Sequence, residues 1–209
     1  MNDFFKRIFT DKKQPAEQPA KKKLTWQQSL FRDSKDLLLV IGVFMLIYVL
    51  FFRAVVVVGS SMYDTLMDGD RLLVINNLVY TEPKHGDIIV ASKDSFRNGE
   101  CIIKRVIATE GQTVDIDFAR GIVYVNGEAL DEPYISSDTK RPEGVSFPLT
   151  VEPGCIFVMG DNRKDSKDSR DPEIGLIDKR EVLGKAIFLL FPGGNDFLDK
   201  DFSRIGVVG

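Results

Sequence analysis

Apolar residues gather in one long run near the start of the chain. The run extends from Leu37 to Phe52, 16 residues without a charged side chain, and is followed by Arg53 and by four valines at 55–58. A helix needs about 20 apolar residues to cross a bilayer. Arg53 can reach the interface with its long side chain, and the residues after it add length. The pattern predicts a transmembrane anchor over residues 37–54, preceded by a short interfacial helix within 24–36.

Two other kinds of segment share this pattern. One is a helix buried in a protein core, but a helix that is apolar all round needs a larger protein to cover it. The other is a cleavable signal peptide, whose apolar region is about 7–15 residues long and ends at small residues without an intervening arginine. The run therefore favours an anchor over both.

After the anchor the pattern changes to short β-like segments. Seven segments rich in apolar and β-branched residues are bounded by turn residues: 71–75, 87–91, 101–108, 113–117, 122–125, 155–159 and 181–191. Asn126-Gly127 lies between two apolar runs and is a strong hairpin signal. We therefore expect a mainly β fold, in which an N-terminal transmembrane helix leads into a domain over residues 55–209. That domain is predicted to be a barrel or sandwich of short antiparallel strands.

Positive charge is concentrated before the anchor. Residues 1–36 carry nine Lys or Arg and five acids, whereas the whole chain has a net charge of -3. Because basic residues mark the cytoplasmic flank of a membrane helix, residues 1–36 are predicted to be a cytoplasmic leader and the β domain to be extracytoplasmic. The whole chain has no basic excess, so its composition does not suggest a nucleic-acid partner.

The cysteine and histidine counts limit the chemistry. Cys101 and Cys155 are the two cysteines, too few for a disulfide framework or a tetrahedral zinc site. We expect two buried thiols, with a single disulfide as the alternative. His85 is the one histidine and lies in the turn sequence Pro-Lys-His-Gly, which favours an exposed loop position over a place in a Ser-His-Asp triad.

A candidate nucleophile, Ser61, follows the anchor closely. A serine hydroxyl is a weak nucleophile unless a neighbouring base removes its proton. Lys104 is a candidate base, because strand periodicity places it between Ile102 and Val106 on one face. Burial there can lower a lysine pKa from about 10.4 by up to ~3–5 units. A strand-edge lysine whose ammonium reaches water fits the same periodicity, so the pattern alone leaves both possibilities open.

A polar run follows the strand-like segment that ends at Met159. It reads Gly160-Asp161-Asn162-Arg163-Lys164-Asp165-Ser166-Lys167-Asp168-Ser169-Arg170-Asp171. A calcium loop of the EF-hand type needs acids at alternate positions, glycine at the sixth and glutamate at the twelfth, but Arg163, Ser166 and Pro172 occupy these places. A solvated charged loop remains the alternative to a functional site.

Taken together, these segments resemble the type I signal peptidases, membrane proteases that release exported proteins. The resemblance extends from the anchor to Phe191-Pro192 and depends on the order and spacing of five motifs. These are Gly59-Ser60-Ser61-Met62 with Thr65-Leu66, Gly86-Asp87-Ile88-Ile89, Lys104-Arg105-Val106-Ile107, Gly160-Asp161-Asn162-Arg163 with Ser166, Asp168, Ser169 and Arg170, and Gly184-Lys185-Ala186. The resemblance implies a single-pass protein of the bacterial cell membrane.

The resemblance also implies roles for single residues. Ser61 is the nucleophile, Lys104 the general base, and Ser166 the residue that orients the lysine amine. The supporting residues, which hold the site together by hydrogen bonds and ion pairs, are Asp161, Asp168, Arg170 and Arg105. The implied activity is the removal of N-terminal signal peptides from exported preproteins through an acyl-enzyme on Ser61. No metal or organic cofactor is implied.

Substrate binding is expected at strand edges. By resemblance, an extended substrate pairs its backbone with residues 55–58 and 101–104, by β-addition. Small residues before the cut would enter shallow apolar pockets, which we expect at Val57, Leu66 and Ile102. The expected partners are exported preproteins, the phospholipid bilayer and, in addition, the protein export machinery.

Three positions depart from the pattern of the resembled family. Some members carry a serine where this chain has Gly59, and its hydroxyl helps to bind the oxyanion. Here the Ser61 backbone N–H must supply more of that binding, or water or Ser60 contributes. Asp64 replaces a proline, and residues 108–111 read Ala-Thr-Glu-Gly where relatives often have Gly-x-Pro-Gly. Both changes keep the reactive side chains but could alter substrate preference.

Two other functions fit part of the pattern. One is a Ser/Lys self-cleaving regulator of the repressor type, but no helix-turn-helix pattern precedes Leu37. The other is a catalytically inactive membrane-anchored β domain that only binds exported chains. The presence of both Ser61 and Lys104 argues against the second function, whereas Gly59 and Asp64 keep it open.

Overall fold

The computed structural model describes residues 26–93, 96, 99–194 and 200–208. Residues 1–25, most of the predicted cytoplasmic leader, lie outside the described residues. The chain divides into two compact units, Met1–Phe44 and Met45–Gly209.

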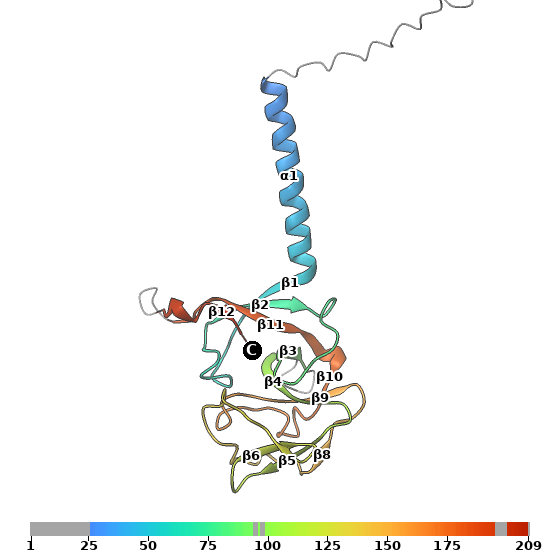
Figure 1. Ribbon diagram of the computed structural model, residues 1–209, viewed down its shortest axis with the longest axis vertical. Coiled ribbons are helices and arrows are strands. Elements are labelled where there is room, and N and C mark those ends of the chain that lie inside the picture. Colours follow the sequence, from blue (N-terminus) through green and yellow to red (C-terminus); the bar gives the residue numbers. More distant parts are fainter. Residues whose placement is uncertain (1–25, 94–95, 97–98, 195–199, 209) are drawn as a thin grey trace, which may run out of the picture. The chain divides into compact units, whose positions relative to one another are not determined.

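The apolar run forms a single helix, α1, which extends over Trp26–Phe51 (Figure 1, blue). The short interfacial helix and the anchor that we expected are thus one continuous helix. Its segment Ser34–Phe51 is long and apolar enough to cross a membrane, by length and composition. The helix ends at Phe51, and residues 52–54, which we expected within the anchor, instead begin a strand that pairs with the next one.

The larger of two antiparallel sheets has eight strands among the described residues. Seven of them lie in the order β1-β2-β11-β3-β4-β9-β10, and β12 pairs with β11. The bounds are Phe52–Val56 (β1), Arg71–Asn76 (β2), Ile88–Ser92 (β3), Cys101–Thr109 (β4), Cys155–Met159 (β9), Ile177–Asp178 (β10), Val182–Phe191 (β11) and Gly206–Val207 (β12). Within the described residues, the short 3-10 helices Lys179–Glu181 and Phe202–Arg204 precede β11 and β12.

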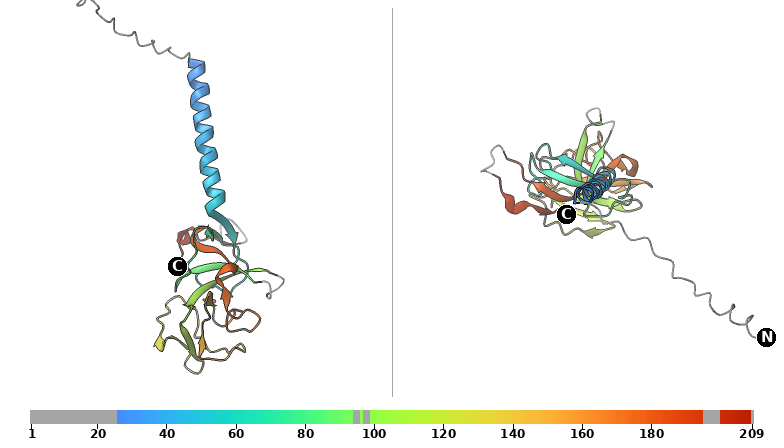
Figure 2. Two further views of the ribbon diagram at one scale, coloured as in Figure 1. Left: turned by 90° about the vertical axis from the view of Figure 1, so that its right-hand side faces the viewer. Right: turned by 90° about the horizontal axis from the view of Figure 1, so that it is seen from above.

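The smaller sheet has four strands in the order β7-β6-β5-β8. Its strands are Thr113–Asp117 (β5), Ile122–Val125 (β6), Glu128–Ala129 (β7) and Leu149–Thr150 (β8). The predicted hairpin joins β6 to β7, and Asn126 and Gly127 take φ angles of 53° and 83°. Positive φ at both central residues is typical of the tight turn that matches strand twist. This sheet lies at one end of the Met45–Gly209 unit in two views (Figures 1 and 2).

Strand β4 connects the cores of the two sheets. Its first half places Ile102 and Val106 in a core cluster of the larger sheet, whereas Ile107 and Ala108 pack into the core of the smaller sheet. The pairing of β4 with β9 shifts register between Val106 and Ala108, which marks a β-bulge. Bulges bend a strand and re-aim its side chains. The bend begins two residues after Lys104. This lysine therefore lies close to the point where β4 passes from one core to the other.

The mainly β fold expected from the sequence is confirmed, and each of the seven predicted segments contains a strand. The expectation of two buried thiols was wrong for Cys101, which is exposed because it begins β4 near solvent; Cys155 is half-buried, and both thiols are free. His85 is exposed, as predicted, and its Nδ1 lies 2.8 Å from the Ile107 carbonyl oxygen.

Candidate active site

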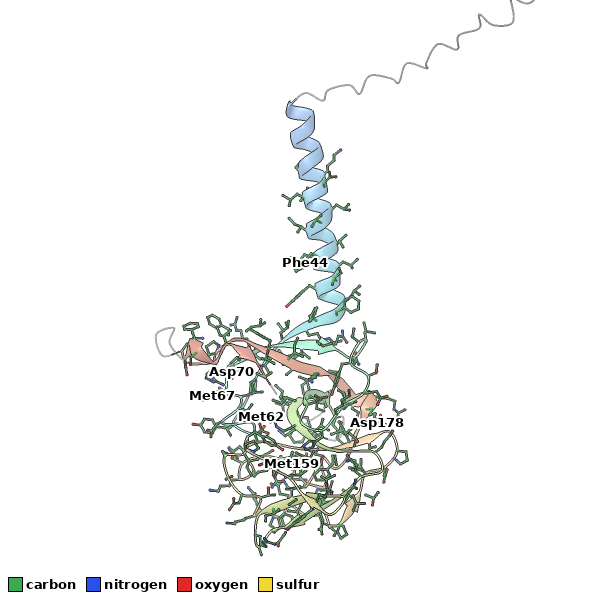
Figure 3. The ribbon with its side chains drawn as sticks, in the orientation of Figure 1. Phe44, Met62, Met67, Asp70, Met159 and Asp178 are labelled. Atoms are coloured by element: carbon green, nitrogen blue, oxygen red, sulfur yellow. The ribbon has the colours of Figure 1, made fainter. Side chains whose placement is uncertain are left out.

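Ser61 lies on the loop that joins β1 to β2. Two backbone hydrogen bonds close the base of this loop, from the Val57 N–H to the Asp70 carbonyl oxygen at 2.8 Å and from the Gly69 N–H to the Val57 carbonyl oxygen at 2.9 Å. The loop residues Met62 (labelled in Figure 3) and Leu66 are buried in the core beneath it. Because its neighbours are fixed on both sides, the loop presents the Ser61 hydroxyl in a defined direction.

Lys104 is buried beside this hydroxyl. It lies on β4 opposite Ile89 of β3, and the residue is only 4% exposed. Its Nζ donates a hydrogen bond to Ser61 Oγ at 2.7 Å and another to the Ile103 carbonyl oxygen at 3.1 Å. The strand-edge alternative, in which the amine reaches water, is therefore wrong. The candidate nucleophile and the candidate base are in direct contact.

The surroundings of Lys104 lower its pKa. Burial, which disfavours the charged form, is the largest cause of this shift. The charge of Arg170 also lowers the pKa, whereas the carboxylates of Asp168, Asp161 and Glu143 raise it, and together these effects bring it from 10.5 to about 8. A neutral amine at 2.7 Å can accept the proton of the serine hydroxyl. The pair can thus activate Ser61 for attack on a carbonyl carbon.

Asp161 and Arg105 form a buried ion pair next to the nucleophile loop. The guanidinium of Arg105 donates two hydrogen bonds to the Asp161 carboxylate, at 2.9 and 2.8 Å, in a bidentate arrangement. Thr65 Oγ1, from the nucleophile loop, also donates to Asp161 at 2.6 Å. Arg105 is further covered by the Tyr134 ring, whose centroid lies 4.0 Å from its guanidinium carbon. Asp161 therefore connects β4 to the loop that carries Ser61.

Asp168 and Arg170 form a second buried pair. Arg170 donates to the Asp168 carboxylate from Nε and Nη2, both at 2.8 Å. Despite full burial, the pKa of Asp168 is lowered, because its carboxylate also accepts from the Gly160 N–H and from Ser166 Oγ. The Ser166 hydroxyl thus donates its hydrogen bond to Asp168. Within the described residues, no hydrogen bond joins Ser166 to Lys104, so the role expected of Ser166 stays a prediction.

Gly160 lies where two parts of the site approach most closely. A Cβ atom at this position would be 2.1 Å from Ser166 Oγ and 2.4 Å from the Ser61 carbonyl oxygen. Both distances are far shorter than van der Waals contact, so only glycine fits here. The next residue but one, Asn162, donates its backbone N–H to the Ser61 carbonyl oxygen at 3.0 Å and its side-chain amide to the Ser60 carbonyl oxygen at 3.1 Å.

The Gly59 departure has a local cause. Gly59 takes a φ of 90°, a conformation that residues with a side chain rarely adopt, and its N–H donates to Asp68 at 2.7 Å. Ser60, the other residue considered as an oxyanion donor, gives its hydroxyl proton to Asp165 at 2.6 Å. Both positions therefore stabilise the loop in this conformation.

A groove with a volume of about 410 Å³ runs past the two reactive groups. The residues that line it come from the end of β1 and the loop after it, from the connection between β3 and β4, from the start of β4, and from the polar run: Val55, Val56, Val57, Val58, Gly59, Ser60, Ser61, Met62, Phe96, Glu100, Cys101, Ile102, Ile103, Lys104, Asp165 and Lys167. Two of the expected pocket residues, Val57 and Ile102, are among them. The third, Leu66, does not line the groove and is fully buried in the core instead.

Sequence reasoning missed the contribution of the loop between β7 and β8. From this loop Glu132 forms a bidentate ion pair with buried Arg163, at 2.5 and 3.0 Å, and Glu143 reaches toward Arg170. The presence of Arg163 in the polar run was a signal that a buried acid should exist. The irregular loop, however, gave no periodic pattern from which to name its partner.

Comparison with known proteins gives the class of this protein. Residues 31–191 match the family model described as signal peptidase, peptidase S26. Because this match spans most of the chain, the chain belongs to that family and is a serine-type peptidase.

Individual relatives agree with this assignment. The chain is 38% identical over 174 residues to signal peptidase I of Bacillus licheniformis, a match that covers 79% of this chain and 91% of that protein. It is 36% identical over 190 residues to signal peptidase I T of Bacillus subtilis (strain 168), covering 87% and 94% respectively. A crystal structure of a signal peptidase I from Enterococcus faecalis V583 is 31% identical, with a TM-score of 0.43, and covers 50% of this chain and 96% of that one.

Proposed function

We propose that this chain is a membrane-anchored endopeptidase that removes N-terminal signal peptides from exported preproteins, with Ser61 and Lys104 as a catalytic dyad. The observation that carries the proposal is the 2.7 Å contact between Lys104 Nζ and Ser61 Oγ in buried surroundings. Membership of the signal peptidase family supports the substrate class.

The dyad works in two steps. In acylation, neutral Lys104 takes the hydroxyl proton while Ser61 Oγ attacks the scissile carbonyl carbon; the C–N bond then breaks, and the proton passes to the leaving amine. In deacylation, Lys104 takes a proton from water as the water oxygen attacks the ester carbon; the C–O bond to Ser61 then breaks, and the proton passes from Lys104 to Ser61 Oγ. Lys104 must be neutral at the start of each step, and its pKa of about 8 makes this form accessible near neutral pH.

The oxyanion that forms in each step needs a hydrogen-bond donor. The Ser61 backbone N–H is our candidate, because the Gly59 N–H and Ser60 Oγ are engaged with Asp68 and Asp165. Loss of one such donor typically costs ~10²–10³ in rate. With a single protein donor, we expect correct placement of the nucleophile loop to be especially important.

The groove accommodates an extended substrate. Residues 55–58 and 101–104 supply its two walls, so a substrate strand can add its backbone between them. Val57 and Ile102 line this groove with apolar side chains. We propose that they form the pockets for the small residues that precede the cut.

The helix α1 is proposed as the anchor, with the leader in the cytoplasm and the β domain outside. From Leu37 onward the helix is apolar all round, so packing on one side cannot cover it. The signal sequence of a preprotein is itself apolar, and a shared bilayer would bring enzyme and substrate into one thin layer. An interaction with the export machinery stays a prediction.

The two other functions considered from the sequence are less well supported. A repressor-type regulator does not account for the family match over residues 31–191. An inactive binding domain does not account for a buried lysine whose amine contacts a serine hydroxyl, since burying an unused charge costs stability.

The direct test is cleavage of a model precursor by the purified full chain in detergent, with the cut position determined from product mass. We expect one cut at the end of the signal peptide. Ser61→Ala and Lys104→Met should each reduce kcat/KM at least ~10³-fold, because either change removes a member of the dyad. The matched control is Lys140→Met, which removes an exposed lysine paired with Asp138 and should cleave like the wild type. Full activity of Ser61→Ala or Lys104→Met would refute the assignment.

A further inference from the structure

One buried acid close to the site takes no part in the mechanism described above. Glu143 lies on the loop between β7 and β8, and its side chain is 8% exposed. Its Oε1 is 3.7 Å from Arg170 Nη2, whereas its buried Oε2 has no hydrogen-bond partner within the described part of the chain. Burying a carboxylate without full pairing is costly, which suggests that the position is used.

The backbone of the loop is built around Arg170. Arg170 Nη1 donates to the Arg141 carbonyl oxygen at 3.3 Å, and the Val145 N–H donates to the Arg170 carbonyl oxygen at 3.0 Å. Glu143 lies midway between these two contacts. Its position over the guanidinium is therefore fixed by the loop on both sides.

Glu143 also lines a cavity next to the site. This cavity has a volume of about 470 Å³, and its other lining residues are Arg141, Pro142, Asp165, Ser166, Lys167 and Asp171. Ser166 belongs to the site, because its hydroxyl lies beside Gly160 and the Ser61 carbonyl oxygen. Asp165 and Lys167 line both this cavity and the substrate groove, so Glu143 lies in a cavity that adjoins the groove.

Several charges act on Glu143. Burial is the largest cause and raises its pKa, as do Asp168 and Asp171, whereas Arg170 and Arg141 lower it. Of the other charged groups that line the cavity, Asp165 accepts from Ser60, and Lys167 pairs with Asp171 and Glu173. Arg170 links Glu143 to the site, because it also pairs with Asp168, whose carboxylate accepts from the Gly160 N–H and Ser166 Oγ. Its charge also acts on Lys104.

We propose that Glu143 is a positioning residue of the site, which balances the charge of Arg170 and thereby sets the pH at which Lys104 becomes an active base. The proposal rests on the proposed function. Two carboxylates, Asp168 and Glu143, flank one guanidinium, and Asp168 already accepts five hydrogen bonds. Glu143 is the member of this group that also lines the cavity, and its Oε2 has no hydrogen-bond partner within the described residues.

The sign of the effect follows from the charges. An ionised Glu143 favours the protonated form of Lys104, as the other nearby carboxylates do. Removing this carboxylate leaves Arg170 less balanced, so Lys104 should lose its proton at lower pH. The influence of Glu143 is smaller than that of Asp168 or Asp161, and the expected shift is about half a pH unit.

The test is the pH dependence of kcat/KM for the full chain in detergent, from about pH 6 to about pH 10. In Glu143→Gln, which keeps the size of the side chain, we expect the acid limb to move about half a unit lower. This gives an approximately threefold gain in kcat/KM on the acid limb and little change on the plateau. Glu143→Asp keeps the charge and should keep the wild-type acid limb. Glu143→Ala, which leaves room for water, is the second variant in case Glu143→Gln does not fold.

Glu128→Gln is the matched control, because it removes one exposed carboxylate from β7 and should leave the profile unchanged. An acid limb in Glu143→Gln or Glu143→Ala that coincides with the wild type, or moves to higher pH, overturns the proposal. So does a uniform loss of activity at all pH values, which a purely structural role would produce. Failure of the proposed function is distinguishable, since Ser61→Ala would then retain activity.

Discussion

The two sheets of the β domain differ in the kind of side chain that they bury. In the smaller sheet, β5 and β6 alternate buried apolar residues with more exposed ones, and their buried positions are Val114, Ile116, Val123 and Val125. In the larger sheet and the polar run that follows β9, charged side chains are buried: Lys104, Arg105, Asp161, Arg163, Asp168 and Arg170. The first region is built for stability alone, whereas the second accepts the cost of desolvating charges.

The difference shows where function has shaped the chain. A core that needs only to be stable gains nothing from an unpaired lysine, yet Lys104 is buried with a serine hydroxyl and a carbonyl oxygen as its hydrogen-bond partners. The carboxylates of Asp161 and Asp168 are instead satisfied by arginines. The paired charges thus form a frame around Lys104, whose partners are neutral groups.

Among changes that leave the dyad intact, the largest effect is expected from Gly160→Ala, which disrupts the frame of paired charges. The new Cβ would collide with Ser166 Oγ and the Ser61 carbonyl oxygen, at 2.1 and 2.4 Å. The nucleophile loop must then move, and a displacement of about 1 Å can cost ~10²-fold in rate. We expect kcat/KM in the precursor assay to fall by at least that factor.

Gly206→Ala on β12 is the matched control, because a Cβ there meets nothing within 4 Å. It should cleave like the wild type. Wild-type activity of Gly160→Ala would show that the site tolerates a shift of the loop, and that the frame is not needed for catalysis.

A smaller effect, on stability, is expected from Lys104→Met. Below about pH 8 Lys104 is protonated in both the folded and the unfolded chain, so the folded state carries the full cost of burying the charge. This cost fades as the pH rises toward 10.5. The shift of its pKa corresponds to up to about 3 kcal/mol. Denaturant unfolding at pH 7 should therefore show a more stable, inactive variant, with a smaller gain at pH 10.

Val123→Ala in the smaller sheet provides the comparison with Lys104→Met. It opens a gap in an apolar core and should lower the free energy of unfolding by about 2 kcal/mol at both pH values. Its kcat/KM per folded molecule should not change. If Lys104→Met is instead destabilised to a similar degree at pH 7, the lysine is part of a well-satisfied core and not a strained functional group.

Most of the larger strands could be predicted from the sequence, because they alternate or are continuously apolar. Segments 113–117, 122–125 and 155–159 match β5, β6 and β9 residue for residue. The pattern did not predict the start of β1, because residues 52–54 continue the apolar run of the helix and no change of period marks the boundary; only the resemblance indicated a strand edge, at residues 55–58. The two-residue strands β7, β8, β10 and β12 are too short to carry a period.

The site could be predicted only in part. Periodicity grouped Lys104 with Ile102 and Val106, but it could not decide whether that face was buried; family resemblance supplied the pairing with Ser61. The contributions of Glu132 and Glu143 could not be predicted, because they come from an irregular loop whose position depends on long-range packing. Val57 and Ile102 line the groove, whereas Leu66 is buried in the core; that these side chains contact the substrate stays a prediction.

The most direct measurement is an NMR titration of the Lys104 side-chain amine in the full chain, with the signal assigned by its absence in Lys104→Met. We expect the nitrogen shift to titrate with a midpoint near 8, because burial favours the neutral amine. A midpoint near 10.5, the ordinary lysine value, would mean that Lys104 is charged at neutral pH and cannot be the base that activates Ser61.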